Sequence, residues 1–236
     1  MQRVITIDIE TLPATDRTVC RQGQATAAEE TEYLRTALNG DFGRILCIGF
    51  IDEGRCDGQV RRGCFGWDKK QERFTCDERE TLTGFWEMMR VFRPGCDRLV
   101  GHNIFEFDLK FIYKRSIVNG VRPTVELSFA RYRSQPIFDT MREWERWSYR
   151  SCISLERLAR VLRLSSSKEG VDGSKVFELI EAGAHREVRD YCLRDVELTR
   201  AIYRRIVVAT QPPNGFSAFS TRAHGDNLPY LQLARR

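Results

Sequence analysis

Short β-branched and apolar runs recur along the chain and predict the strands of a sheet. The first run covers residues 4–11, and further runs cover 44–51, 59–67, 98–103 and 136–139. The turn residues Asp52, Glu53 and Gly54 separate the second and third runs, which therefore predict a pair of antiparallel strands.

Helical spacing of apolar residues follows most of these runs and predicts helices over 27–38, 82–92, 108–118, 154–162, 175–182 and 186–208. This order of elements indicates an α/β domain with a central mixed sheet and helices on both faces. We expect one domain over residues 1–210. Periodicity is lost from Pro212 and Pro213 onward, so 211–236 is expected to be a mobile tail. Residues 14–39 form a polar segment, and 165–174 form a polar loop.

Composition describes an ordinary globular protein of 236 residues with a formal charge of +5, which is compatible with a polyanionic partner. No apolar run reaches the roughly 18 residues of a membrane span. A secretory signal is not recognisable either, so we expect a cytoplasmic protein with reduced thiols. The spacing of Cys56, Cys64 and Cys76 matches no usual zinc-ligand pattern.

Two carboxylates, Asp8 and Glu10, interrupt the first apolar run. Because side chains alternate along a strand, both point to one face while Ile7 and Ile9 point to the other. Burying two like charges together is costly unless a cation lies beside them, and Mg²⁺ and Mn²⁺ prefer carboxylate oxygens. Alone, the pair fits a metal site and a solvent-exposed edge strand equally well.

Two further acids occupy positions that suit metal ligands. Asp108 begins a predicted helix, where it also suits the helix dipole. Asp195 lies inside the last predicted helix, four residues after Tyr191 and on the same face. Asp is a mediocre helix former, so its presence there requires a partner, either a metal ion or an arginine such as Arg194 or Arg200.

Taken together, these residues form three ordered motifs: Asp-x-Glu at 8–10, Asn-x-x-x-Phe-Asp at 103–108 and Tyr-x-x-x-Asp at 191–195. With them the chain resembles the 3′–5′ exonucleases of the DEDD superfamily, in the subgroup with tyrosine in the last motif, which have the ribonuclease H-like fold. Segments 154–159, 169–176 and 191–196 resemble stand-alone bacterial exonucleases related to the proofreading domain of family B DNA polymerases. The resemblance spans about residues 4–205 and covers neither the polar segment 14–39 nor the tail.

The resemblance implies hydrolysis of phosphodiester bonds with two divalent ions, Mg²⁺ or Mn²⁺, held roughly 4 Å apart. Asp8, Glu10, Asp108 and Asp195 would be the metal ligands, with Asp8 bridging both ions. Tyr191 would orient the attacking water or help to deprotonate it, although packing in the core is its alternative role. The expected reaction is stepwise release of nucleoside 5′-monophosphates from the 3′ end of single-stranded DNA. An exoribonuclease of the same mechanism and a non-catalytic nucleic-acid-binding module are the alternatives.

Residues beside the three motifs are candidates for contacts with the nucleic acid: Thr11, Leu12, Asn103, Phe107, Ser174 and Lys175. Each has a structural alternative. Leu12 and Phe107 would suit the apolar core, Asn103 would suit a helix cap, and Ser174 and Lys175 would suit a solvated helix start. His102 is expected to be structural. A protein partner is not readable from the sequence.

Overall fold

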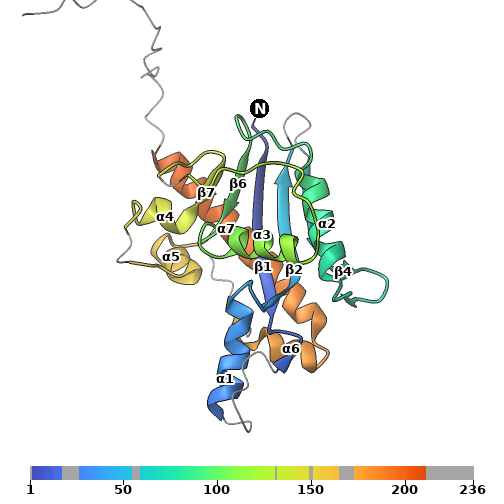
Figure 1. Ribbon diagram of the computed structural model, residues 1–236. Helices are drawn as coiled ribbons and strands as arrows, with labels where there is room; N and C mark the ends of the chain where they lie inside the picture. The colour runs from blue at the N-terminus through green and yellow to red at the C-terminus, as the bar shows by residue number, and fades with distance from the viewer. Residues whose placement is uncertain are drawn as a thin grey trace, which may run out of the picture.

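A mixed five-stranded sheet forms the centre of the molecule (Figure 1), for which a computed structural model describes residues 2–17, 27–54, 59–130, 132–148, 151–164 and 173–210. The strand order is β3-β2-β1-β6-β7. β1 is antiparallel to β2 and parallel to β6, and is therefore a central strand. The strands are β1 (Val4–Leu12), β2 (Arg44–Glu53), β3 (Val60–Phe65), β6 (Arg98–Gly101) and β7 (Ile137–Asp139).

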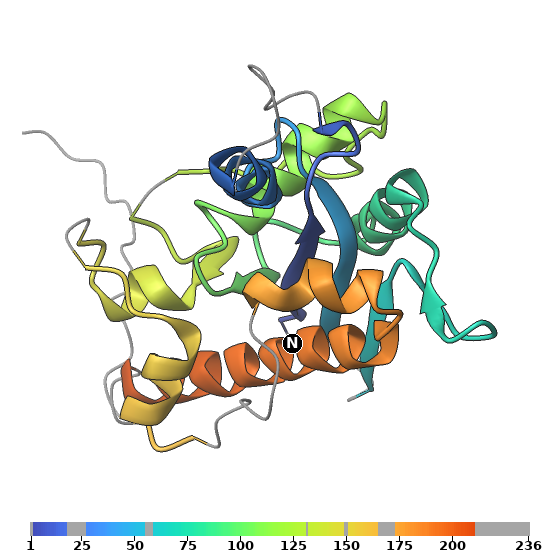
Figure 2. The ribbon, with the colours of Figure 1, turned by 90° about the horizontal axis from the view of Figure 1, so that it is seen from below.

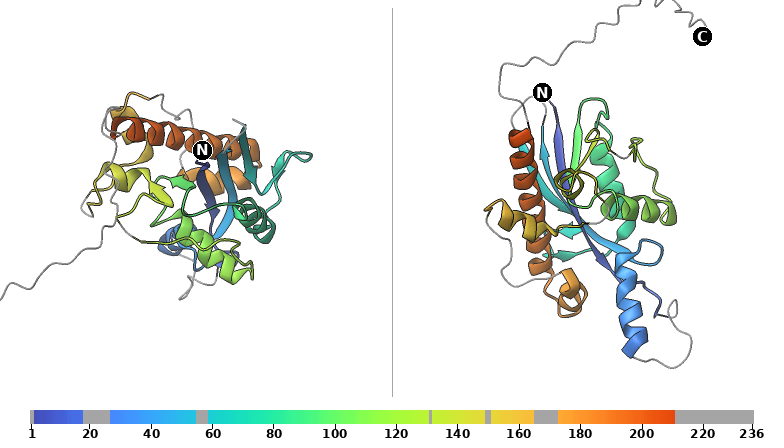
Figure 3. Two further views of the ribbon diagram at one scale, coloured as in Figure 1. Left: turned by 90° about the horizontal axis from the view of Figure 1, so that it is seen from above. Right: turned by 90° about the vertical axis from the view of Figure 1, so that its left-hand side faces the viewer.

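Helices cover both faces of this sheet, as the sequence predicts (Figure 3, right). Helices α2 (Glu78–Met89) and α3 (Asp108–Val118) pack on one face, where Ile5, Ile7 and Ile9 of β1 belong to their apolar cluster. Helix α7 (His185–Thr210) runs across the other face, below β1 and β2 in the view of Figure 2. The remaining helices are α1 (Ala27–Arg35), η2 (Thr36–Leu38), α4 (Thr140–Trp144), α5 (Leu155–Val161), η3 (Gly173–Lys175) and α6 (Val176–Glu181).

The alternation of side chains along β1 determines which of its residues face α7. Its odd-numbered isoleucines fill the core beneath α2 and α3. The even-numbered residues Asp8 and Glu10 are directed to the face that α7 covers. Hydrophobic burial on the first face therefore sets the orientation of both carboxylates on the second.

Several boundaries differ from the prediction. The third strand was expected to extend to Trp67 but ends at Phe65, because Gly66 has a positive φ of 87° that breaks the extended run. A short hairpin follows, formed by β4 (Trp67–Asp68) and β5 (Arg73–Phe74). The helix predicted from residue 82 begins at Glu78, because the side chain of Asp77 accepts a hydrogen bond from the Glu80 amide and caps it.

Other predicted elements agree with the structure or lie outside it. The predicted helix over 108–118 has those bounds, and Ser154 is the N-cap of α5. Most of the predicted loop 165–174 and all of the predicted tail 211–236 lie outside the described residues. Among the helices that the structure describes, none combines the length and apolar composition of a membrane span.

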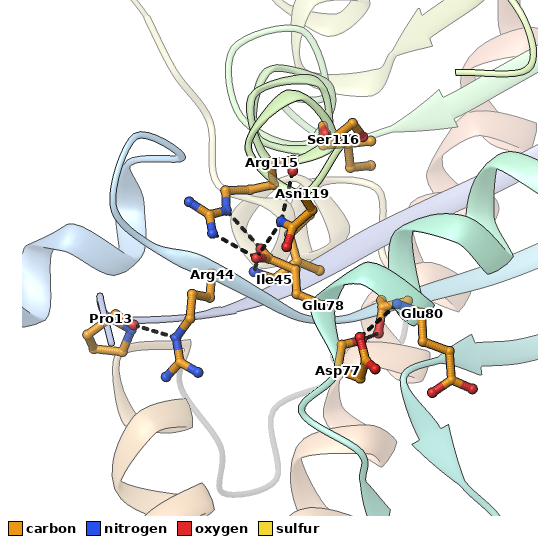
Figure 4. A network of polar contacts seen from close by, with 11 residues as sticks. Pro13, Arg44, Ile45, Asp77, Glu78, Glu80, Arg115, Ser116 and Asn119 are labelled. Atoms are coloured by element: carbon orange, nitrogen blue, oxygen red, sulfur yellow. Dashed lines mark hydrogen bonds and ion pairs between the residues drawn. The ribbon is translucent and has the colours of Figure 1, made fainter. Parts of the chain in front are cut away.

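The side chain of Glu78 connects α2, α3 and β2 (Figure 4). Its carboxylate accepts hydrogen bonds from both Nε (2.9 Å) and Nη2 (2.7 Å) of Arg115 on α3, and from the Asn119 side chain at 2.8 Å. It also accepts the backbone amide of Ile45 on β2 at 2.7 Å. The side chains of Glu78 and Arg115 are only 10% and 9% exposed, so this ion pair is a buried link between α2, α3 and β2.

Replacing Glu78 with Ala is expected to lower the free energy of unfolding by about 3–5 kcal/mol, because the Arg115 guanidinium would stay buried without its counter-charge. Urea unfolding followed by circular dichroism measures this difference. Glu80→Ala is the matched control, since Glu80 is exposed in the same helix turn. Equal midpoints for the two variants would show that the Glu78 network contributes nothing to stability.

Candidate active site

Asp8 and Glu10 lie on a strand that has neighbours on both sides. Asp8 is opposite Gly49 of β2, and β6 pairs with Val4–Thr6 on the other side. The solvent-exposed edge considered for this acidic pair is therefore excluded. Glu10 is only 7% exposed, whereas Asp8 is half-buried.

A β-bulge follows the acidic pair directly. Glu10 is opposite Cys47, whereas Thr11 is opposite Ile45, so Leu46 is an additional residue on β2. Bulges bend the strand that contains them and are frequent beside active sites. The regular pairing of β1 is thus interrupted where the two carboxylates end.

Helix α7 presents Tyr191 and Asp195 to the same face of the sheet, as their spacing predicts. Asp195 is 7% exposed, and the hydroxyl of Tyr191 hydrogen-bonds to its carboxylate. Arg200, considered as a structural partner of Asp195, instead pairs with Glu53 at 2.6 Å. Helix α7 thus places the Asp195 carboxylate and the Tyr191 hydroxyl next to each other.

Asp108 reaches the site from the start of α3. β6 pairs with β1 only at Val4–Thr6, and the backbone amide of Ile9 donates a hydrogen bond to the Asp108 carboxylate. Burial raises the pKa of Asp108 to about 7, with a contribution from the charge of Asp139, while hydrogen bonds from the amides of Asp108 and Ile9 oppose the rise. Asp108 is therefore bound to β1 next to the acidic pair rather than placed only at a helix dipole.

The four carboxylates interact electrostatically. Burial raises the pKa of Asp8 well above its usual value, and Cys192, Glu10, Asp108 and Asp195 raise it further in that order. Burial likewise raises the pKa of Glu10, followed by the effects of Cys192, Asp195 and Asp108. Like charges at short range and loss of water both disfavour ionisation. The site consequently requires positive charge to keep all four groups ionised.

The same carboxylates affect the pKa of Tyr191. Its pKa is raised by burial and then by the charges of Asp195, Glu10 and Asp8, and by its hydrogen bond to Asp195. Its hydroxyl therefore stays protonated at neutral pH and acts as a hydrogen-bond donor.

The donor set fits hard divalent cations. Ligand atoms of Asp8, Glu10 and Cys192 lie within 4.8 Å of one another, and the other two carboxylates act on the same pair. Carboxylate oxygens are the preferred ligands of Mg²⁺ and Mn²⁺, and bound cations reverse the pKa increases of buried acids. The raised pKa values thus indicate carboxylates arranged to hold cations.

The candidate substrate residues next to the acidic pair are already engaged in the fold. The Thr11 hydroxyl donates to the Ala37 carbonyl at 2.6 Å and is half-buried. Leu12 is 5% exposed and packs with Leu46 and Val188. Both residues therefore help to fix the end of β1 against its neighbours.

Asn103 and Phe107 belong to the connection from β6 to α3. Asn103 has a positive φ of 61°, and its carbonyl accepts the amides of Glu106 and Phe107. Asn103 is not the helix cap considered for it, because α3 has Phe107 at its N-cap position. Phe107 is half-buried and packs on Phe111, with ring centroids 5.7 Å apart.

Ser174 and Lys175 are exposed in η3, immediately before α6. A β-carbon built on the preceding Gly173 would lie 3.7 Å from the Tyr191 hydroxyl. The segment that carries Ser174 and Lys175 therefore lies beside Tyr191, on the α7 side of the sheet. This position suits contacts with a substrate phosphate.

Sequence reasoning missed Asp139, which positions the connection between β6 and α3. This fully buried carboxylate accepts the amides of Asn103 at 3.0 Å and Phe105 at 3.3 Å, and it caps α4 through Met141 and Arg142. Its place at the end of a predicted strand, followed by a polar residue, is an N-cap signal that could have revealed it. His102 is held in the same region, with Nδ1 near the Thr140 hydroxyl and Nε2 near the Ile153 carbonyl, both at 2.9 Å.

Gly49 allows α7 to approach the sheet next to Asp8. A β-carbon at this position would lie 2.6 Å from the Cys192 sulfur and 3.1 Å from Cγ2 of Val196. Helix α7 thus lies close over β2 because residue 49 has no side chain.

Gly49→Ala is expected to displace α7 and to lower the free energy of unfolding by about 1–3 kcal/mol, the usual cost of overpacking. Nuclease activity should fall with it, because Tyr191 and Asp195 move with the helix. Thermal unfolding and a nuclease assay measure both effects. Gly95→Ala is the control, since a β-carbon there would meet nothing within 4 Å. Wild-type behaviour of Gly49→Ala would disprove the close approach.

Comparison with known protein families identifies the class to which the chain belongs. Residues 38–212 match a family described as a predicted 3′–5′ exonuclease related to the exonuclease domain of PolB. Asp108, Tyr191 and Asp195 lie inside the match, whereas Asp8 and Glu10 precede it. A search of curated proteins found no match. The match covers more than half of the 236 residues, and the fold agrees with a ribonuclease H-like exonuclease, so the chain belongs to this family of 3′–5′ exonucleases related to the PolB exonuclease domain.

Proposed function

We propose that this exonuclease removes nucleotides one at a time from the 3′ end of single-stranded DNA and releases nucleoside 5′-monophosphates with the help of two divalent cations. The observation that supports it most is the convergence of four carboxylates and a tyrosine from β1, α3 and α7 around Asp8. The family relationship to a DNA polymerase domain favours DNA over RNA.

In this proposal Asp8, Glu10, Asp108 and Asp195 hold the cations, and Asp8 contributes to both. When bound, two divalent ions would lower the pKa of the attacking water and neutralise the leaving oxygen. The raised pKa values of Asp8 and Glu10 describe the metal-free cluster, in which nothing balances the negative charge.

Tyr191 keeps its proton and donates a hydrogen bond, which suits it to orient the attacking water rather than to deprotonate it. Ser174 and Lys175 lie beside it in an exposed segment, and we assign them to the phosphates of the substrate strand. Phe107 and Asn103 would contact the terminal nucleotide from the other side, next to Asp108. Thr11 and Leu12 would support the same nucleotide from the end of β1.

The test is digestion of 5′-labelled single-stranded DNA and of RNA with the same base sequence, in Mg²⁺ or Mn²⁺. The expected result is a ladder of DNA products shortened stepwise from the 3′ end, with 5′-monophosphates released. A strand with a blocked 3′ end is the control and should stay intact. Preferential digestion of the RNA would replace the substrate assignment, and products shortened from the 5′ end would contradict the proposal as a whole.

A further inference from the structure

Three cysteines from three different elements meet beside the carboxylates. Cys47 belongs to β2, Cys64 to β3 and Cys192 to α7, and their sulfur atoms lie within 4.8 Å of one another. Cys47 and Cys192 have no exposed surface, whereas Cys64 is half-buried. The proposed hydrolysis uses none of the three thiols.

The register of the sheet produces this cluster. Asp8 and Cys64 both lie opposite Gly49, one on each side of β2, and Cys47 lies opposite Glu10. Residues directly opposite one another share a face, so the thiols of both strands face α7. The sulfur of Cys192 covers Gly49 from above.

Cys192 therefore lies between the acids and the other two thiols. Its sulfur is within 4.8 Å of ligand oxygens of Asp8 and Glu10, and it donates a hydrogen bond to the Asp8 carbonyl at 3.8 Å. Cys192 thus lies between two groups of possible metal ligands. The hard carboxylate oxygens of Asp8 and Glu10 are on one side, and the soft sulfurs of Cys47 and Cys64 are on the other.

We propose that Cys47, Cys64 and Cys192 form a binding site for a thiophilic divalent cation of the zinc class, separate from the cation site of the four carboxylates. Zinc–sulfur bonds of about 2.3 Å in a tetrahedral site place the sulfurs about 3.8 Å apart. The three sulfur atoms, which lie within 4.8 Å of one another, are near that spacing. Binding releases to solvent the protons that the thiols carry and leaves a fourth ligand position for water. Cys64, the half-buried member, is the point of entry.

Occupation of this thiol site would inhibit the nuclease, a consequence that rests on the proposed function. The Cys192 sulfur would exchange its hydrogen bond to the Asp8 carbonyl for a bond to the cation. The thiol protons that leave balance the charge of the cation, so the effect on Asp8 comes from the displaced Cys192 sulfur and not from added positive charge. Zinc would thus inhibit the reaction without occupying the carboxylate site.

The test is a titration of the reduced full chain with Cd²⁺, followed by the ultraviolet charge-transfer absorbance of cadmium–thiolate bonds. We expect one ion per chain, and binding roughly tenfold or more weaker in Cys64→Ser. Cys152→Ser, which removes an exposed cysteine outside the cluster, should bind as the wild type does. Unchanged binding by Cys64→Ser, or equal loss in both variants, would overturn the proposal. This readout needs no nuclease activity and so stands apart from the proposed function.

Alkylation of the wild type tests the site without any substitution. In mild urea, Cd²⁺ is expected to slow the modification of Cys47, Cys64 and Cys192, while the exposed Cys76, Cys96 and Cys152 react at an unchanged rate. Equal protection of these six cysteines, or protection of none of them, would contradict the proposed site. In the nuclease assay at fixed Mg²⁺, inhibition by Zn²⁺ should require a roughly tenfold higher concentration in Cys64→Ser. Equal sensitivity of the two proteins would exclude the inhibitory role.

Discussion

Replacing Asp8 with Asn is expected to reduce exonuclease activity roughly 10³-fold or more while the fold is retained. Cation stabilisation of the developing charge is worth several kcal/mol, and each ~1.4 kcal/mol is tenfold in rate. Asn has almost the same shape as Asp but lacks the charge, so the packing between β1, Gly49 and α7 should survive. Single-turnover digestion of labelled DNA at saturating Mg²⁺ measures the loss.

Asp195→Asn should show a loss of the same order, because Asp195 acts on the same cluster from α7. Glu197→Gln is the control from the same helix. Glu197 is exposed, forms its ion pair with Arg62 and should be replaceable without loss of activity. If Asp8→Asn and Asp195→Asn both digested DNA at rates near that of Glu197→Gln, the four carboxylates would not be the catalytic centre.

The parts of the site that sequence reasoning could locate are those with a local pattern. Asp8 and Glu10 stand out because two acids interrupt an apolar strand, and Tyr191 and Asp195 stand out because of their spacing within a helix. In the structure these four residues and Asp108 lie around the acidic pair of β1. Local pattern singled out each residue, and the resemblance to the exonucleases joined them into one predicted site.

Other features depend on which residues become neighbours in three dimensions. The thiol cluster arises because Cys64 and Asp8 share Gly49 as a cross-strand partner, and apolar periodicity does not determine that register. Asp139 is similar, since its carboxylate accepts hydrogen bonds from amides of a connection more than 30 residues earlier in the chain. The break after Phe65 was missed for a different reason, because one glycine with positive φ ended an otherwise continuous apolar pattern.

The carboxylate cluster also predicts how the stability of the metal-free protein depends on pH. Asp8, Glu10 and Asp108 all have raised pKa values in the folded state, so the folded protein binds more protons than the unfolded chain. Stability then falls as pH rises from the unfolded pKa through the folded one. For Asp108 the change from 3.8 to about 7 corresponds to roughly 4 kcal/mol.

His102 has the opposite effect on stability. It limits the pH range in which the loss of stability caused by the carboxylates can be measured. Burial lowers the pKa of His102 to about 4, so this residue destabilises the fold at low pH, and its penalty disappears as pH rises to its usual value of 6.5. Above that value His102 no longer changes the balance. Cys64 acts against the carboxylates in this range, because hydrogen bonds with Cys192 and Cys47 lower its pKa to about 5. The part of the fall that Asp8→Asn removes therefore reports the carboxylates.

Metal-free wild-type protein is accordingly expected to melt at progressively lower temperature between about pH 6.5 and about pH 8.5. Asp8→Asn should melt higher than the wild type in this range, by a margin that grows with pH, because one of the repelling charges is removed. Saturating Mg²⁺ should raise the melting temperature of the wild type most at the highest pH and should raise that of Asp8→Asn much less. Calorimetry in the presence and absence of a chelator measures all three effects. If the difference in melting temperature between the wild type and Asp8→Asn did not grow with pH in chelator, the four acids would not share one buried cluster.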